Sequence, residues 1–194
     1  MAKILVRRMM FMIVVATLIT LSIISGCVTS NGSFPNSRKM TAVRQIFPPA
    51  VDITEMQINQ GAQVSGRPDD AKISEIKDDS GLLGYCVESK VVSRSGPFRI
   101  RVLLDQQLIV KKATVISYPG ERGRDVRKRI FTDQFQGKGP DDPIQIGEDI
   151  DAISGATISS RIMTEGVHDT IILLKLVKET QHKNQTESSS SPNN

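Results

Sequence analysis

The chain has 194 residues, of which 39% are hydrophobic, 24% are charged and only 4% are aromatic, and its formal net charge is +4. This length suits one domain with flanking segments. Residues 1–26 hold three basic residues and no acidic residue, so the formal net charge of the rest of the chain is three lower, at +1. This small charge gives no indication of nucleic-acid binding.

Residues 1–26 have the pattern of a signal peptide. Lys3, Arg7 and Arg8 precede an apolar run that ends in Ser-Gly, directly before Cys27. This arrangement resembles a bacterial lipobox, which implies cleavage before Cys27 and attachment of lipid, palmitate among the acyl chains, to that residue. The alternative is an uncleaved membrane-spanning helix, because about 18 apolar residues approach the minimum span. In both cases the positive charges predict a domain on the extracytoplasmic face of a bacterial membrane.

The remaining segments differ in composition. We expect residues 27–37 to be a lipidated tether, residues 38–180 to be the folded domain, and residues 181–194 to be a disordered polar tail.

Hydrophobic periodicity within the domain predicts an α+β fold, in which helices pack on an antiparallel sheet built from consecutive hairpins. Two short helices are predicted first, followed by three strands and then two longer helical segments. In chain order these are helices at 37–46 and 70–76, strands at 82–92, 98–104 and 108–118, and helices at 125–135 and 158–178.

Thiols and imidazoles are few. With Cys27 acylated, Cys86 is the remaining thiol, so no intramolecular disulfide is expected. A single cysteine in a strand is either a redox thiol or, more commonly, a small packed apolar residue. Two histidines, His168 and His182, without a Cys-x-x-Cys pair do not point to a metal site.

The most informative segment reads Asp-Ala-Ile-Ser-Gly-Ala-Thr, from Asp151 to Thr157, directly before the last predicted helix. The start of a helix has free N–H groups and the positive end of the helix dipole, so it favours an anion. Gly155 and Ala156 leave the backbone open to a bulky phosphorylated ligand. The alternative is an ordinary helix cap made by a hydroxyl.

This segment resembles the attachment motif of the FMN-binding domain family, which occurs in the G subunit of the Rnf complex and the C subunit of the sodium-translocating quinone reductase. There the motif is roughly Asp-x-x-Ser/Thr-Gly/Ser-Ala-Thr, and its last Thr carries FMN through a phosphoester. The resemblance spans roughly residues 69–178. It implies covalent FMN on Thr157, with Ser154, Gly155 and Ala156 around it, and Asp151 as a residue that the attaching enzyme recognises.

The loop before the helix at 125–135 also resembles the family, in which this loop lies near the flavin. The corresponding residues are Glu121, Arg122 and Gly123, although Tyr-Pro-Gly-Glu at 118–121 departs from the Glu-Thr-Pro-Gly of Rnf-type proteins. Tyr118 either stacks on the flavin or packs at a strand end.

The basic residues near these segments each allow two interpretations. The cluster at positions 122, 124, 127, 128 and 129 is either a solvated surface or an anion-binding or docking face. Arg161, four residues after Thr157, either reaches a phosphate on that residue or faces solvent.

The resemblance implies a membrane-anchored, extracytoplasmic electron-transfer flavoprotein. A separate Mg-dependent flavin transferase would attach FMN from FAD, and the flavin would carry electrons from a membrane donor to a redox acceptor, more as a carrier than as a stand-alone enzyme. Two alternatives belong to other classes. One is a non-redox lipoprotein acting as a structural or ligand-binding module. The other is a hydrolase using Ser154 or Thr157 with His168, which lies three turns into the predicted helix.

Overall fold

A computed structural model describes residues 36–56, 70–94 and 96–189. The predicted signal peptide, Cys27 and nearly all of the predicted tether lie outside the described residues. Within the described residues, no helix is both long enough and apolar enough to cross a membrane.

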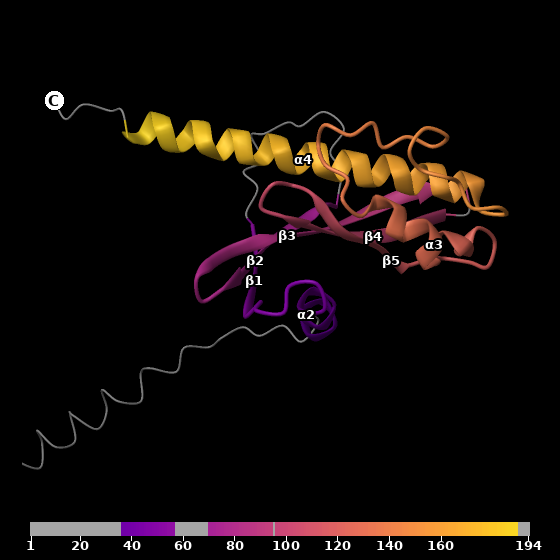
Figure 1. Ribbon diagram of the computed structural model, residues 1–194, viewed down its shortest axis with the longest axis horizontal. Coiled ribbons are helices and arrows are strands. Elements are labelled where there is room, and N and C mark those ends of the chain that lie inside the picture. The colour runs from indigo at the N-terminus through magenta and orange to yellow at the C-terminus, as the bar shows by residue number, and fades with distance from the viewer. Residues whose placement is uncertain (1–35, 57–69, 95, 190–194) are drawn as a thin grey trace, which may run out of the picture. The chain divides into compact units, whose positions relative to one another are not determined.

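The centre of the domain is a five-stranded antiparallel sheet (Figure 1). Strands that follow one another in the chain are neighbours in the sheet, which confirms the predicted α+β fold and its consecutive hairpins. The strands are β1 (Asp52–Glu55), β2 (Lys72–Asp78), β3 (Gly81–Ser93), β4 (Gly96–Asp105) and β5 (Val110–Ser117).

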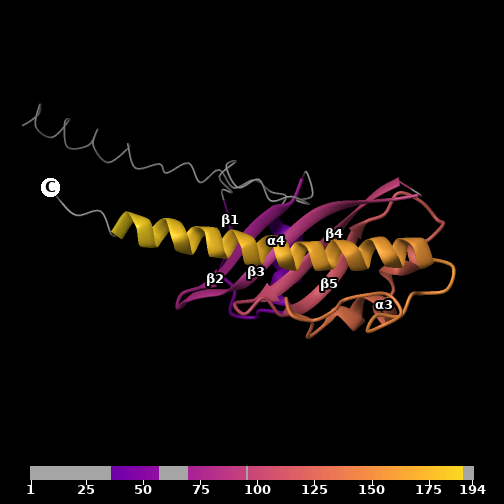
Figure 2. The ribbon, with the colours of Figure 1, turned by 90° about the horizontal axis from the view of Figure 1, so that it is seen from above.

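Helices cover both faces of the sheet. The long helix α4 (Thr157–Ser189) lies across one face, and α2 (Asn36–Arg44) packs on the other (Figures 1 and 2). Alternate residues of β4 follow this division, because Ile100 and Val102 belong to the core under α4, whereas Leu103 packs with the residues of α2. Complete burial of one such side chain stabilises the fold by about 1.5–3 kcal/mol.

The helix α4 packs close to the sheet at Gly166. A β-carbon added there would lie 2.5 Å from Cγ1 of Val91 in β3 and 3.2 Å from Cδ1 of Ile100 in β4. This close packing, together with fully buried Met163 and Val167, fixes the first half of α4 on the sheet.

The prediction of a helix at 70–76 was wrong, because this segment contains the first residues of β2. Ile73 and Ile76 are three residues apart, as on a helix, but they point to opposite faces of a strand. Both are buried, since Ile73 packs under α4 and Ile76 packs on the α2 side. The short strand β1, where Ile53 alone is buried, was not predicted.

The predicted helix at 125–135 exists as three short segments. They are the 3₁₀ turn η2 (Arg124–Arg127), the helix α3 (Arg129–Thr132) and the 3₁₀ turn η3 (Asp133–Phe135). Extended backbone at Lys128, with a ψ of 141°, breaks the helical run.

The final helix extends further than predicted. It continues to Ser189, so the prediction of disorder beginning at residue 181 was wrong up to that point. The segment from 181 to 189 holds neither Pro nor Gly, and a helix that is already nucleated propagates through such residues.

Candidate functional site

A tight turn leads into α4. The N–H of Ala156 donates to the carbonyl of Ile153 at 3.0 Å, which closes a four-residue turn around Ser154 and Gly155. Gly155 has a φ of +77°, as the third residue of a type II turn requires, and this backbone conformation favours glycine. The glycine of the motif therefore sets the direction in which the chain enters the helix.

The first turn of α4 has no side-chain cap. The carbonyl of Ala156 accepts the first helical hydrogen bond, from the N–H of Ser160 at 2.8 Å, so Ala156 occupies the N-cap position and offers no side-chain acceptor. In the described part of the chain, no acceptor binds the N–H groups of Thr157, Ile158 and Ser159. This helix start therefore presents free donors together with the positive end of the dipole.

Thr157 is the first residue of the helix, and its side chain is exposed. Among the described residues its hydroxyl makes no hydrogen bond. A hydroxyl that caps a helix would bind a backbone N–H two or three residues further on. The alternative that Thr157 is an ordinary cap is therefore wrong for this structure.

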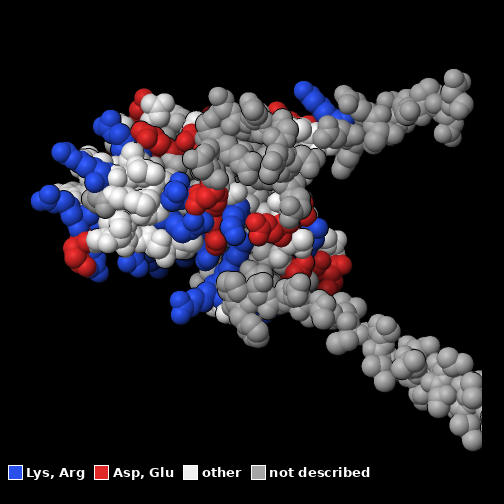
Figure 3. Space-filling model, turned by 180° about the vertical axis from the view of Figure 1, so that it is seen from behind, with Lys and Arg blue, Asp and Glu red and all other residues white. Residues whose placement is uncertain are grey.

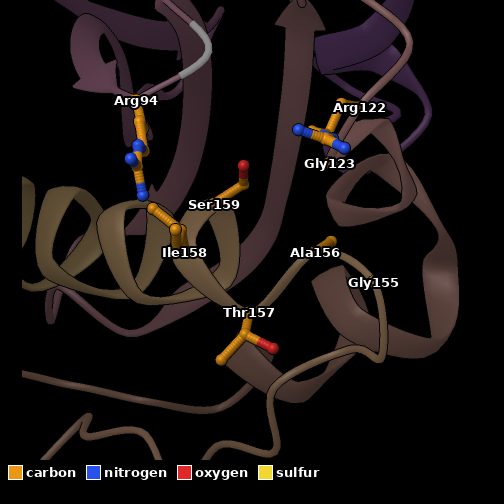
Figure 4. Close-up of a pocket in the computed structure, with 8 residues that line it drawn as sticks. All are labelled: Arg94, Arg122, Gly123, Gly155, Ala156, Thr157, Ile158 and Ser159. Atoms are coloured by element: carbon orange, nitrogen blue, oxygen red, sulfur yellow. The ribbon is translucent and has the colours of Figure 1, made fainter.

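A pocket of about 580 Å³ opens at the helix start (Figure 4). This volume lies within the range of roughly 300–1,000 Å³ that small-molecule and cofactor sites occupy. Its walls come from the turn between β3 and β4, the loop after β5 and the first turn of α4. The lining residues are Arg94, Arg122, Gly123, Gly155, Ala156, Thr157, Ile158 and Ser159.

Tyr118 and Ser159 join the loop after β5 to α4. Their hydroxyl oxygens lie 2.7 Å apart, and the Tyr118 hydroxyl also donates to the carbonyl of Arg122 at 3.2 Å. The Tyr118 ring packs against Phe98, with 5.1 Å between ring centroids. Of the two roles considered for Tyr118, the structure supports packing.

Gly123 fits closely against this hydroxyl pair. Its φ is +80°, and a β-carbon added to it would lie 2.6 Å from the Tyr118 hydroxyl and 2.7 Å from the Ser159 hydroxyl. Both the backbone conformation and the packing therefore favour glycine at this position.

The structure brings together Thr157, Gly155, Ala156, Arg122 and Gly123, all of which were predicted for one site. The other predicted residues lie outside this lining. Ser154 is exposed in the turn, Asp151 is exposed before it with its backbone bound by Gln134, and Glu121 is exposed and forms an ion pair with Arg124.

Arg161 does not line this pocket. It lies with Thr164 and Glu165 beside a second depression, which also includes residues 144–146. The prediction that Arg161 reaches a phosphate on Thr157 therefore gains no support from its position.

Sequence reasoning missed Arg94, Ile158 and Ser159 as lining residues. Arg94 lies in the β3–β4 turn, far upstream of the motif, and pairing of the strands carries it to the helix start. Ser159 could have been identified from the sequence, since it is a small polar residue on the apolar side of the predicted helix.

Cys86 and His168 take no part in this site. Burial raises the pKa of the fully buried Cys86 to about 11, which suits a packed apolar residue and opposes a reactive thiolate. His168 lies about 16 Å along α4 from Thr157, so it does not reach that hydroxyl.

Residues 94–172 match the FMN-binding domain family. No curated protein matches the chain. The matched segment contains every residue that lines the pocket, and it lies within the span that the sequence motifs indicated. The match over residues 94–172 makes this part of the chain similar to the FMN-binding domain family, and it supports a flavin-binding protein with FMN as the cofactor.

Proposed function

We propose that this protein is an electron-transfer flavoprotein of the bacterial cell envelope, held to the membrane by lipid on Cys27 and carrying FMN through a phosphoester to Thr157. The observation that carries the attachment is the Thr157 hydroxyl. It is exposed at the first helical residue, makes no hydrogen bond among the described residues, and belongs to a pocket within the family match.

The residues around this hydroxyl suit a phosphorylated flavin. A phosphate on Thr157 would lie beside the free N–H groups of the first turn, where the helix dipole favours negative charge. The turn at Gly155 leaves the approach to Thr157 open, since a β-carbon added there would have no neighbour within 4 Å. The pocket volume suits a cofactor of this class.

Attachment would be catalysed by a separate flavin transferase with Mg²⁺ and FAD. The Thr157 oxygen would bond to the phosphorus on the riboflavin side of FAD, the pyrophosphate bond would break, AMP would leave, and the hydroxyl proton would pass to a base of the transferase. Asp151, exposed six residues upstream, is the residue that we propose the transferase recognises.

Bound FMN supplies the ability to take up two electrons and release them singly, which side chains lack. The residues of this chain would hold the flavin at the surface, where a membrane donor and a redox acceptor reach it in turn. Covalent attachment would keep the cofactor outside the cytoplasm, where lost FMN is not replaced.

Production of the full chain with and without a flavin transferase tests the attachment. The expected product carries the added mass of one FMN less one water on the peptide that contains Thr157, and it stays yellow after acid precipitation and washing. Colour that washes out after denaturation would leave flavin binding but contradict the phosphoester. A colourless product of unchanged mass would favour the non-redox lipoprotein, and labelling of Ser154 by a fluorophosphonate probe would favour the hydrolase.

A further inference from the structure

Two arginines at the pocket differ from most other cations of this region. Arg94 and Arg122 have no carboxylate partner among the described residues. Three nearby cations are paired locally, namely Arg124 with Glu121, Lys128 with Asp125, and Arg129 with Asp133. These pairs cancel part of the charge of their own segment. Arg127 also has no carboxylate partner among the described residues, but it lies outside the pocket lining, so the unpaired positive charge that lines the pocket comes from Arg94 and Arg122.

The two arginines approach the pocket from different elements (Figure 4). Arg94 extends from the β3–β4 turn and Arg122 from the loop after β5, and both line the pocket together with Ile158 of the first turn of α4. Ile158 is an apolar side chain with 51% of its surface exposed. The mouth of the pocket therefore combines an exposed apolar residue with two unpaired positive charges.

The position of Thr157 argues against a role for these arginines in holding the cofactor phosphate. In Figure 4 the Thr157 side chain leaves the first turn on the side away from both guanidinium groups. The free N–H groups of the helix start already provide donors for a phosphate on that residue. The guanidinium groups thus remain available to a second molecule.

We propose that the mouth of the pocket, defined by Arg94, Arg122 and Ile158, is the docking surface for an electron-transfer partner with an acidic face. This inference rests on the proposed function, because an electron partner must approach the flavin at this opening. Unpaired charges at the edge of an interface steer an oppositely charged partner and raise its association rate, and an apolar centre suits the middle of the contact. Lys and Arg side chains also gather at the end of the domain that carries α3 (Figure 3).

Charged inorganic oxidants test the electric field at this opening. The probes are ferricyanide, an anion, and tris(phenanthroline)cobalt(III), a cation. The reduced, flavinylated full chain in uncharged detergent is mixed with each probe by stopped flow, over a range of ionic strength. Each oxidant takes one electron, so two are consumed per reduced flavin, and the protons of the ring pass to the buffer.

For the wild type, the ferricyanide rate should fall and the cobalt rate should rise as salt is added. Arg94→Gln and Arg122→Gln should each slow the reaction with ferricyanide by about fivefold at low ionic strength and accelerate the reaction with the cobalt complex by a similar factor. Arg94→Lys, which keeps the charge, should leave both rates close to those of the wild type.

Arg129→Gln is the matched control. It removes the same charge from an exposed residue outside the pocket lining, where Arg129 is paired with Asp133 at 3.2 Å, and it should change neither rate by more than about twofold.

The direction of the changes decides the outcome. Rates that move together for both oxidants would mean that the arginines set the flavin potential, and this would overturn the docking surface. Unchanged rates, or equal effects from Arg129→Gln, would overturn it as well. Failure of the proposed function would be seen earlier. A chain that takes up no flavin lacks flavin absorbance and has an unchanged mass, and both are measured before the kinetics.

Discussion

Gln134 holds the backbone of Asp151 through two hydrogen bonds across a separation of 17 residues. Its side-chain oxygen accepts from the N–H of Asp151 at 2.7 Å, and its side-chain amide donates to the carbonyl of Asp151 at 3.2 Å. The first residue of the attachment motif is thereby fixed to the end of the helical segment after β5, while the Asp151 side chain stays exposed. The two family segments identified in the sequence are joined at this point.

Gln134→Ala should slow flavin attachment, because Asp151 would no longer be held in one position for the transferase. We expect a several-fold lower initial rate at limiting transferase and a free energy of unfolding lower by about 1–2 kcal/mol, from the two lost hydrogen bonds. Gln136→Ala, an exposed glutamine two residues away, is the control and should change neither quantity. An unchanged attachment rate in a destabilised Gln134→Ala protein would restrict Gln134 to a structural role.

Asp151→Asn should slow attachment strongly without releasing flavin that is already bound. The carboxylate is the group that we expect the transferase to recognise, and it takes no part in the phosphoester. Initial rates at limiting transferase measure the first effect, and the absorbance of protein modified before dilution measures the second. Attachment at the wild-type rate would rule out recognition through this carboxylate.

Thr157→Ala should abolish covalent flavin while leaving the fold intact. The hydroxyl makes no hydrogen bond among the described residues, so its removal should change the free energy of unfolding by less than about 0.5 kcal/mol. Intact mass and colour after acid precipitation report the attachment, and chemical denaturation reports the stability. Ser154→Ala removes another exposed hydroxyl of the motif and should remain yellow. Flavin retained by Thr157→Ala through acid precipitation would show that another residue carries it.

Gly123→Ala should destabilise the protein and impair the site. Alanine is strained at a φ of +80°, and its β-carbon would press on the hydroxyls of Tyr118 and Ser159, so we expect a loss of about 2 kcal/mol or more. Denaturant midpoints measure this loss. Gly120→Ala lies in the same loop without a neighbour within 4 Å, and it should be close to neutral. Equal midpoints for the two variants would contradict the packing described here.

Cys27→Ala should block lipid attachment and leave residues 1–26 on the chain. Fractionation alone would mislead, because the uncleaved apolar segment can still hold the protein in the membrane. Labelled-palmitate incorporation and the mass of the amino-terminal peptide distinguish the two models. A wild-type chain with an intact Met1 and no lipid would favour the signal-anchor helix, and the attachment of FMN to Thr157 would remain possible.

Local patterns were enough wherever polar and apolar residues alternate in step with the two faces of an element. In β4, Arg99 and Arg101 alternate with buried apolar residues along 98–102, which predicted the strand, and apolar spacing after residue 157 predicted the packed half of α4. The same approach failed at 70–76, because helices cover both faces of the sheet there. Ile73 and Ile76 enter separate cores, and their spacing then imitates a helix.

The sequence by itself determined the resemblance to the FMN-binding domain family, the motif from Asp151 to Thr157 and the order of the main strands, because these depend on residues that are close together in the chain. Only the tertiary structure decided that Ala156, which has no hydroxyl, occupies the N-cap, that Arg94 lines the pocket at the helix start, and that Arg161 does not line it. It also decided which arginines find a carboxylate. These facts depend on strand pairing and on the packing of α4 against the sheet. Both bring together segments that are far apart in the chain, and no local sequence pattern predicts which of them will meet.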